Sequence, residues 1–389
     1  MMKTMFRFAS LLSAAVMLFA SCGEITPDPT PTPDDTNQEG TKPEEDVTDG
    51  PGILTLEVDY QIIQAGVDQS KLTVKLDGKL VTEDVVFIDG KNNVVDLGPD
   101  FVFTTTEAGE YSFWATYKKY NSNTVTITVV NTPVPQTPED PQPESTSFVR
   151  RVLLTKVTGA GCIACPNMTL ALHDFFANNE LAKHTVKAEA HTYDGGYDPA
   201  QLSSFYSVSS WPTLIFDWAF SFTPSQNVVT LHAVEEYVKQ RYEAEQAKAA
   251  IAVNSICENG AITFKVCVKA AESTQYRVGA WLLEDNIQGQ QSGVDSRPEN
   301  AFYHEFDDCI RIADSKLSSS VWSGHKLGGI EAGKTAEKMF SWTLKESWKV
   351  ENLKLCIFVS TPDEAGRNYY VNNVIVAPIN GMTQFEYAK

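Results

Sequence analysis

The first segment of the chain with enough apolar residues to form a core shows a regular alternation of apolar and polar residues. Within residues 53–131 the alternation has a period of two in the segments LTLEVDY, KLTVKL, YSFWATY and TVTITVV. Turn sequences such as LDGK and IDGKNN separate such segments. This pattern predicts half-buried strands. About seven short strands in a segment of this length predict an all-β sandwich.

The pattern changes within residues 148–249. An apolar strand, FVRRVLLTKVT, precedes a helical segment in which Met168, Leu172, Phe175 and Phe176 share one face. The strand HTVKAEAHTY, a loop with a short helix, the strand SVSSWPTLIFDWAF and the amphipathic helix TLHAVEEYVKQRYEAEQAK follow. Strands that alternate with helices predict an α/β layer structure with parallel pairing.

Alternation of period two returns in residues 250–389, without a helix-length amphipathic run. Segments such as AITFKVCV, YRVGAWLLED and LKLCIFVST predict a second all-β sandwich of about 140 residues. If Asn259-Gly260 forms a two-residue hairpin, Cys257 and Cys267 point to opposite faces of the sheet. Any disulfide among the last four cysteines is therefore expected to reach across to Cys309 or Cys356.

Two segments lack the apolar residues of a core. Residues 22–52 and 132–147 are rich in Pro, Thr and acids, which predicts an extended tether and an extended linker. The tether has nine acids and one lysine between residues 23 and 50, and the linker has three acids and no base. These charges of −8 and −3 are more than half of the net charge of −19. Without a basic patch, nucleic-acid partners are not expected.

The first 21 residues predict export. Lys3 and Arg7 precede the apolar stretch Phe8–Ser21, which is too short to span a membrane and resembles a signal peptide. The sequence LFASC resembles the lipobox of bacterial lipoproteins, in which the cysteine, here Cys22, becomes the acylated N-terminus. The alternative is ordinary signal cleavage with a spare cysteine.

The segment TGAGCIACPNM places Cys162 and Cys165 between a strand and a helix. If Cys162 begins the helix, the helix dipole and unpaired N–H groups would stabilise its thiolate. Cys162 would then be the nucleophile, and Cys165 would resolve the mixed disulfide. A structural disulfide is the alternative. A zinc site lacks a second ligand pair nearby, so neither a metal nor another cofactor is expected.

The segment VSSWPTLIF lies about fifty residues further on. It resembles the thioredoxin-fold segment in which a cis-proline precedes a central strand. The resemblance implies that Pro212 packs against the cysteine pair and that the backbone of Trp211 binds substrate. The sequence departs from thioredoxins, because Gly161 replaces the usual tryptophan and Lys156 stands where they place a buried acid. The dipeptide Ile163-Ala164 also has no polar group to stabilise a thiolate.

Other polar clusters carry weaker predictions. His191, Asp194 and Asp198 follow the second strand, in HTYDGGYDP. His191 could transfer a proton near Cys162, and the acids could hold calcium, but their spacing fits no EF-hand pattern, which favours a structural loop. The contiguous polar residues of FYHEFDDC would point to alternating faces of a strand, which argues against a metal site.

Taken together, VLLTKVTGAGCIACPNMTLALHDF, AHTYDGGYDP, SVSSWPTLIFD and FYHEFDDCIRIA resemble the outer membrane protein 28 family of lipoproteins. This resemblance extends from about Arg150 to the C-terminus. It implies a lipid-anchored outer-membrane protein, facing the periplasm or the cell surface, with a thioredoxin-like domain and a poorly defined activity. Separately, TEAGEYSFWATYKKYNSNTVTITVV resembles bacterial immunoglobulin-like domains, which place a tyrosine, here Tyr111 after Gly109, at a sheet corner.

The expected fold class is therefore multidomain: an all-β immunoglobulin-like sandwich, an α/β thioredoxin-like domain and an all-β sandwich. The first functional hypothesis is thiol–disulfide exchange on exported proteins through Cys162 and Cys165. The alternative is a non-catalytic surface adhesin or binding lipoprotein with a structural disulfide, so the sequence leaves open whether the chain is an enzyme. Catalysis requires an accessible Cys162. If the Cys162 sulfur is buried, or if Pro212 lies on a remote surface, the enzyme hypothesis fails and the chain is only a tethered scaffold.

Overall fold

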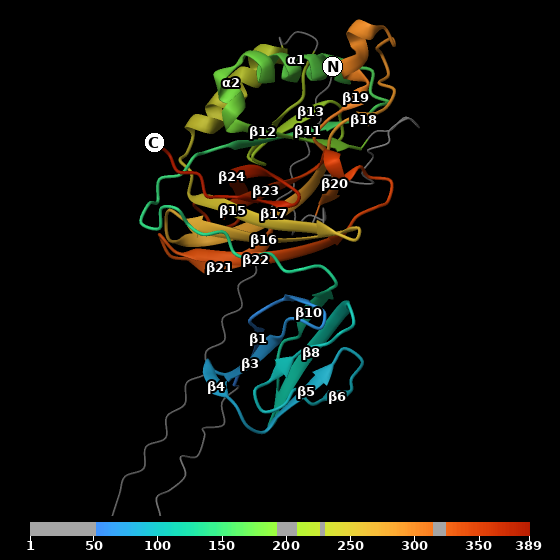
Figure 1. The fold of residues 1–389 in the computed structure, drawn as a ribbon. Helices are drawn as coiled ribbons and strands as arrows, with labels where there is room; N and C mark the ends of the chain where they lie inside the picture. Colours follow the sequence, from blue (N-terminus) through green and yellow to red (C-terminus); the bar gives the residue numbers. More distant parts are fainter. Residues whose placement is uncertain (1–51, 193–207, 226–229, 314–323) are drawn as a thin grey trace, which may run out of the picture. The chain divides into compact units, whose positions relative to one another are not determined.

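The computed structural model describes residues 52–192, 208–225, 230–313 and 324–389 (Figure 1). The expected signal peptide, Cys22, Asp194 and Asp198 lie outside these residues. Of the described residues, 47% are in strands and 14% in helices. None of the helices in these ranges is long and apolar enough to cross a membrane.

Residues 54–130 form ten short strands in two sheets, where about seven strands were expected from the sequence pattern. The strands are β1 (Leu54–Val58), β2 (Ile62–Gln64), β3 (Ser70–Leu76), β4 (Lys79–Val81), β5 (Val85–Asp89), β6 (Val94–Val95), β7 (Val102–Phe103), β8 (Gly109–Tyr117), β9 (Tyr120–Asn121) and β10 (Val125–Val130). One sheet has the order β1-β3-β4 with β7 beside β3, and the other has the order β2-β10-β8-β5-β6 with β9 beside β8.

Alternate residues of these strands form one apolar core, because successive side chains of a strand point to opposite faces. Leu72 and Val74 of β3 and Ile127 of β10 are fully buried in it. The Tyr111 hydroxyl donates a hydrogen bond of 3.0 Å to the backbone carbonyl of Glu107, which fixes the start of β8.

The remaining elements begin at Val152. They are β11 (Val152–Thr158), α1 (Cys165–Asn178), η1 (Glu180–His184), β12 (Thr185–His191), β13 (Thr213–Phe216), β14 (Phe220–Phe222), α2 (Thr230–Glu243), β15 (Ala249–Glu258), β16 (Ala261–Ala270), β17 (Thr274–Glu284), β18 (Ile287–Gln288), η2 (Pro298–Tyr303), β19 (Glu305–Phe306), β20 (Cys309–Ala313), β21 (His325–Ile330), β22 (Thr335–Thr343), η3 (Val350–Asn352), β23 (Leu353–Pro362), β24 (Tyr369–Pro378) and β25 (Gly381–Thr383).

The expected fold class, with an α/β thioredoxin-like domain followed by a separate all-β sandwich, is wrong. One nine-stranded sheet has the order β14-β13-β11-β12-β20-β17-β23-β24, with β21 beside β17, so it contains strands from both expected domains. The two halves join where Glu189 of β12 pairs with Cys309 of β20. Hydrophobic alternation identifies strands but not the edges that pair, and an unpaired β12 edge would leave N–H and C=O groups exposed.

Within this sheet, β11 is parallel to β12 and antiparallel to β13. Leu154 of β11 packs with α1 and α2, and Figure 1 shows both helices over this part of the sheet. Its neighbour Leu153 points to the opposite face, into a core shared with β17, β23 and β24. A third core lies between β17, β23, β24 and the four-stranded sheet β22-β16-β15-β25.

The hairpin of β15 and β16 has the predicted register. Cys257 pairs with Ile262, and Cys267 pairs with Ala252. The turn residues Asn259 and Gly260 both have positive φ, at 51° and 74°, as a two-residue hairpin of this twist requires. All four late cysteines are free thiols, so Cys257 and Cys267 do not bridge, and no disulfide to Cys309 or Cys356 is formed either.

Candidate functional site

Cys162 and Cys165 form a disulfide in the connection between β11 and α1. The helix begins at Cys165, and Cys162 lies in the preceding turn, where its N–H donates a 3.0 Å hydrogen bond to the Gly159 carbonyl. Pro166 explains this boundary, because a residue without an N–H and with a fixed φ fits the first turn of a helix. The prediction that Cys162 itself begins the helix is therefore wrong.

Both cysteines of this pair are buried. Cys162 is 5% exposed and Cys165 is 0% exposed, whereas Ile163 between them is 77% exposed. Residues 291–293, hereafter the covering segment, contact the turn. A Cβ atom on Gly293 would meet the carbonyl oxygen of Ile163 at 2.9 Å, so the two backbones are in close contact.

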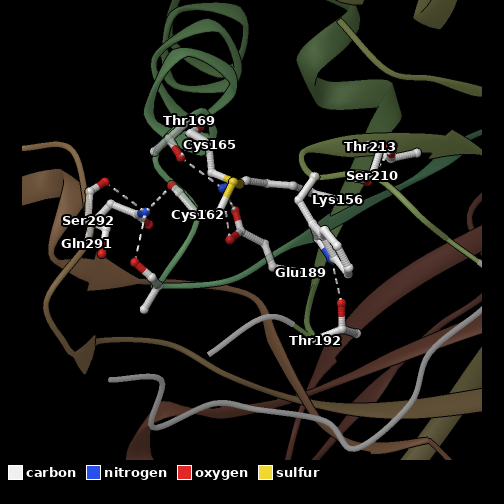
Figure 2. The surroundings of a disulfide bond; sticks show 12 residues. Lys156, Cys162, Cys165, Thr169, Glu189, Thr192, Ser210, Thr213, Gln291 and Ser292 are labelled. Atoms are coloured by element: carbon white, nitrogen blue, oxygen red, sulfur yellow. Dashed lines mark hydrogen bonds and ion pairs between the residues drawn. A yellow bond between two sulfur atoms is a disulfide. The ribbon is translucent and has the colours of Figure 1, made fainter. Parts of the chain in front are cut away.

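Side-chain and backbone hydrogen bonds hold the covering segment in place. Gln291 Nε2 donates to the carbonyl of Cys162 at 2.9 Å and to that of Ala160 at 3.2 Å. The N–H of Ser292 also donates to the Ala160 carbonyl, at 2.7 Å. Figure 2 shows the Gln291 amide directed at these carbonyl groups. Because Gln291 is buried and its Nε2 donates to two carbonyls of the turn, the contact is a specific one.

On β11, Lys156 forms a buried ion pair with an acid that sequence reasoning missed. Lys156 and Glu189 are cross-strand partners on β11 and β12, and Nζ lies 3.1 Å from Oε2. Lys156 Nζ also donates to Thr169 Oγ1 at 2.9 Å, and that hydroxyl donates to the Cys165 carbonyl at 3.3 Å. The ion pair is thus connected to the backbone of the cysteine pair (Figure 2).

Glu189 also contacts Lys187 and His191. Lys187 Nζ lies 2.9 Å from Glu189 Oε1, and His191 Nε2 lies 3.5 Å from Oε2. Burial alone would raise the pKa of Glu189, but the charges of Lys156 and Lys187 outweigh burial and hold the pKa well below its usual range. Glu189 is therefore a structural anion. Its place in HTVKAEAHTY, an acid between two alanines on an apolar strand, was the available sequence signal.

His191 is almost fully buried at the end of β12, opposite Thr158 of β11. Its ring lies 4.8 Å from the ring of Phe306. Burial raises the pKa of the neighbouring Cys309 thiol, and His191 opposes that shift. The structure thus places His191 with Glu189 and Cys309, and its proposed proton transfer to Cys162 stays a prediction.

The Trp211–Pro212 peptide bond is cis, as the resemblance of VSSWPTLIF implied. Trp211 Nε1 donates a hydrogen bond of 2.8 Å to Thr192 Oγ1. The next residue, Thr213, pairs with Val157 of β11. Pro212 is therefore buried beside the end of β11, where the turn to Cys162 begins, and not on a remote surface.

A pocket of about 660 Å³ lies beside the Lys156–Glu189 pair. Its walls come from α1, from β12, from residues 302–308 and from β24. Leu172, Phe176 and Phe302 contribute apolar surface, and Asp307 and Glu305 contribute carboxylates. Neither cysteine of the disulfide lines this pocket. In the described ranges, no three His, Cys, Asp or Glu side chains are arranged to hold a metal ion.

Comparisons with known proteins bear on the second half of the chain. Residues 200–381 match the family of the outer membrane protein Omp28. This match confirms the expected outer-membrane localisation. The matched segment begins after Cys165, so the disulfide lies outside it, and neither a thioredoxin-like domain nor the immunoglobulin-like class of residues 53–131 is confirmed. No curated protein sequence matches the chain.

Solved structures show distant similarity. HBP35 of Porphyromonas gingivalis is 14% identical, with a TM-score of 0.48, over 62% of this chain and 81% of that protein. A domain of the outer membrane lipoprotein Omp28 from Porphyromonas gingivalis is 18% identical, with a TM-score of 0.23, over 34% of this chain and 97% of that domain. At these TM-scores the similarity assigns neither fold nor function.

Proposed function

We propose that this outer-membrane protein is a lipid-anchored, non-catalytic binding protein in which Cys162–Cys165 is a structural disulfide. One observation carries the proposal: both cysteines of the pair are buried, and Gln291 of the covering segment is hydrogen-bonded to the backbone of their turn. Disulfide exchange requires an attacking thiolate to reach a sulfur atom, and burial prevents this approach. The pair therefore holds the turn between β11 and α1 and does not exchange electrons with a substrate.

The binding partners would be exported or surface components, because the expected signal peptide sends the chain out of the cytoplasm. The lipobox-like sequence supports attachment to the membrane through acylated Cys22. Labelling cells with a radioactive fatty acid tests the anchor. The wild-type chain should be labelled and Cys22→Ala should not. Equal labelling of the two would contradict attachment at this residue.

Reduction kinetics test the structural role of the disulfide. The native protein, incubated with millimolar dithiothreitol at neutral pH, should keep Cys162–Cys165 intact long after an exposed disulfide is reduced. A Cys165→Ser variant expressed in cells should accumulate no mixed disulfides with exported proteins, with Cys257→Ser as the matched control. Rapid reduction of the native protein, or trapped partners specific to Cys165→Ser, would contradict the proposal.

Thiol–disulfide exchange on exported proteins is the second candidate, favoured by the buried Lys156–Glu189 pair that is connected to Cys165 through Thr169. A substrate thiolate would attack Cys162, and Cys165 would leave as a thiolate and take a proton. A second substrate thiol would lose its proton and displace Cys162, so that the substrate becomes a disulfide and the pair becomes two thiols. This cycle requires the covering segment to move away first.

A further inference from the structure

The pocket beside α1 has an apolar side. Leu172 and Phe176 of α1 face it, and Phe302, Phe306 and Val376 line it from the opposite elements. Val376 is 40% exposed. Small-molecule sites combine apolar and aromatic side chains with polar groups that orient the ligand, and this lining contains both kinds. The apolar body of a ligand would replace water at these side chains.

The cations that line the pocket are already neutralised. Arg151 pairs with Glu386 at the rim, and Lys156 pairs with Glu189. Lys187 lies between Glu189 and Asp308. An anionic ligand would have to displace one of these carboxylates, so the pocket is not arranged for anions.

Two carboxylates in the pocket have no such partner. Three cations and five carboxylates line the pocket, which leaves a net charge of −2. Within the described ranges, neither Glu305 nor Asp307 has a cation in salt-bridge contact; Glu305 accepts a hydrogen bond from Gln288, and Asp307 accepts one from the N–H of Asn286. Burial raises the pKa of Asp307, the neighbouring carboxylates Asp285 and Asp308 add to this shift, and Lys187 opposes it.

We propose that this pocket binds a small organic cation, an ammonium or guanidinium group on an apolar body. The cation would lie against Asp307 and Glu305, and the apolar body would lie among Phe176, Phe302 and Leu172. The aromatic faces at the pocket add a favourable contact for a cation. This inference rests on the proposed binding function and specifies the class of its ligand.

A matched set of three probes tests the proposal on the full mature chain. Isothermal titration with 2-phenylethylamine, 2-phenylethanol and 3-phenylpropanoate varies the charge while the aromatic body stays the same. The amine should bind at least tenfold more tightly than the alcohol, and the acid should bind most weakly. Equal affinity for the amine and the alcohol would overturn the proposal.

Variants locate the site. Asp307→Asn and, separately, Glu305→Gln should weaken amine binding about tenfold and leave alcohol binding unchanged, whereas Glu364→Gln, on an exposed turn, should change neither. Two carboxylate variants keep the test decisive if one of them fails to fold. If Glu364→Gln weakened amine binding by the same factor, the assignment of the binding site to this pocket would be wrong. Disulfide reduction, measured on the same samples, separates the two proposals: a resistant disulfide with no amine binding contradicts only the ligand.

Discussion

Gln291 donates a hydrogen bond of 2.9 Å from its side-chain amide to the carbonyl oxygen of Cys162, across 129 residues of sequence. The same amide reaches the carbonyl of Ala160 at 3.2 Å. These bonds hold the covering segment against the turn that carries the disulfide. If this contact limits the access of a reductant to the sulfur atoms, a substitution at Gln291 should change the rate of reduction.

Replacing Gln291 with alanine should make the disulfide easier to reduce. Gln291→Ala removes the amide that the carbonyls of Ala160 and Cys162 share, which should lower the free energy of unfolding by about 1–2 kcal/mol and loosen the covering segment. The rate of reduction by dithiothreitol should rise at least tenfold. Gln290→Ala, at the exposed neighbouring residue, is the control. Identical rates in the two variants would show that Gln291 does not limit access.

Removing the disulfide should cost modest stability. In Cys162→Ser with Cys165→Ser, the unfolded chain regains the entropy of a very short loop, which corresponds to about 2 kcal/mol. Urea denaturation should show this decrease in the free energy of unfolding. Ligand binding in the pocket should persist, because neither cysteine lines it. A loss of binding in the double variant without a loss of stability would contradict a purely structural role.

The Lys156–Glu189 pair gives a second stability prediction. Glu189→Gln leaves the Lys156 ammonium buried without a carboxylate, and such changes cost about 3–5 kcal/mol. Lys156→Met combined with Glu189→Leu removes both charges and should recover most of that loss. Thermal or urea denaturation of the three proteins provides the comparison. If the double variant were as unstable as Glu189→Gln, packing rather than charge would explain the effect.

Glu189 also predicts how stability depends on pH. Its pKa in the folded chain is held well below 4.5, the value expected for an unfolded glutamate. A carboxyl group of this kind contributes stability that is complete above the unfolded pKa and is lost as the pH falls towards the folded pKa. The difference in unfolding free energy between wild type and Glu189→Gln should therefore shrink below about pH 4.5. A constant difference down to pH 2 would contradict this assignment.

Alkylation should distinguish the four free thiols. Cys257 is half-buried, whereas Cys267, Cys309 and Cys356 are buried. Burial raises the pKa of Cys267 to about 12, so very little of it is thiolate at neutral pH. Iodoacetamide should modify Cys257 first in the native protein and all four thiols in urea, as peptide mapping would show. Early modification of Cys309 would indicate an open route to the covered turn.

Much of the local structure could be predicted from the sequence. The β15–β16 hairpin register followed from alternating residues and Asn259-Gly260. The position of the cysteine pair between a strand and a helix, and the cis bond between Trp211 and Pro212, followed from short motifs. These features depend on residues that are neighbours in the chain, and backbone geometry and side-chain alternation act over that range.

Only the tertiary structure decided how the strands join and what they enclose. The pairing of Glu189 with Cys309 merges two expected domains into one sheet, and Gln291 bonds the backbone of Cys162, one of the two cysteines that the sequence presented as a possible catalytic pair. Each of these contacts joins residues more than one hundred positions apart in the chain, and no periodicity encodes which distant edge or loop will pair. The sequence determined the strands and the turns, and the long-range pairing of edges and loops determined which strands share a sheet and which residues are buried.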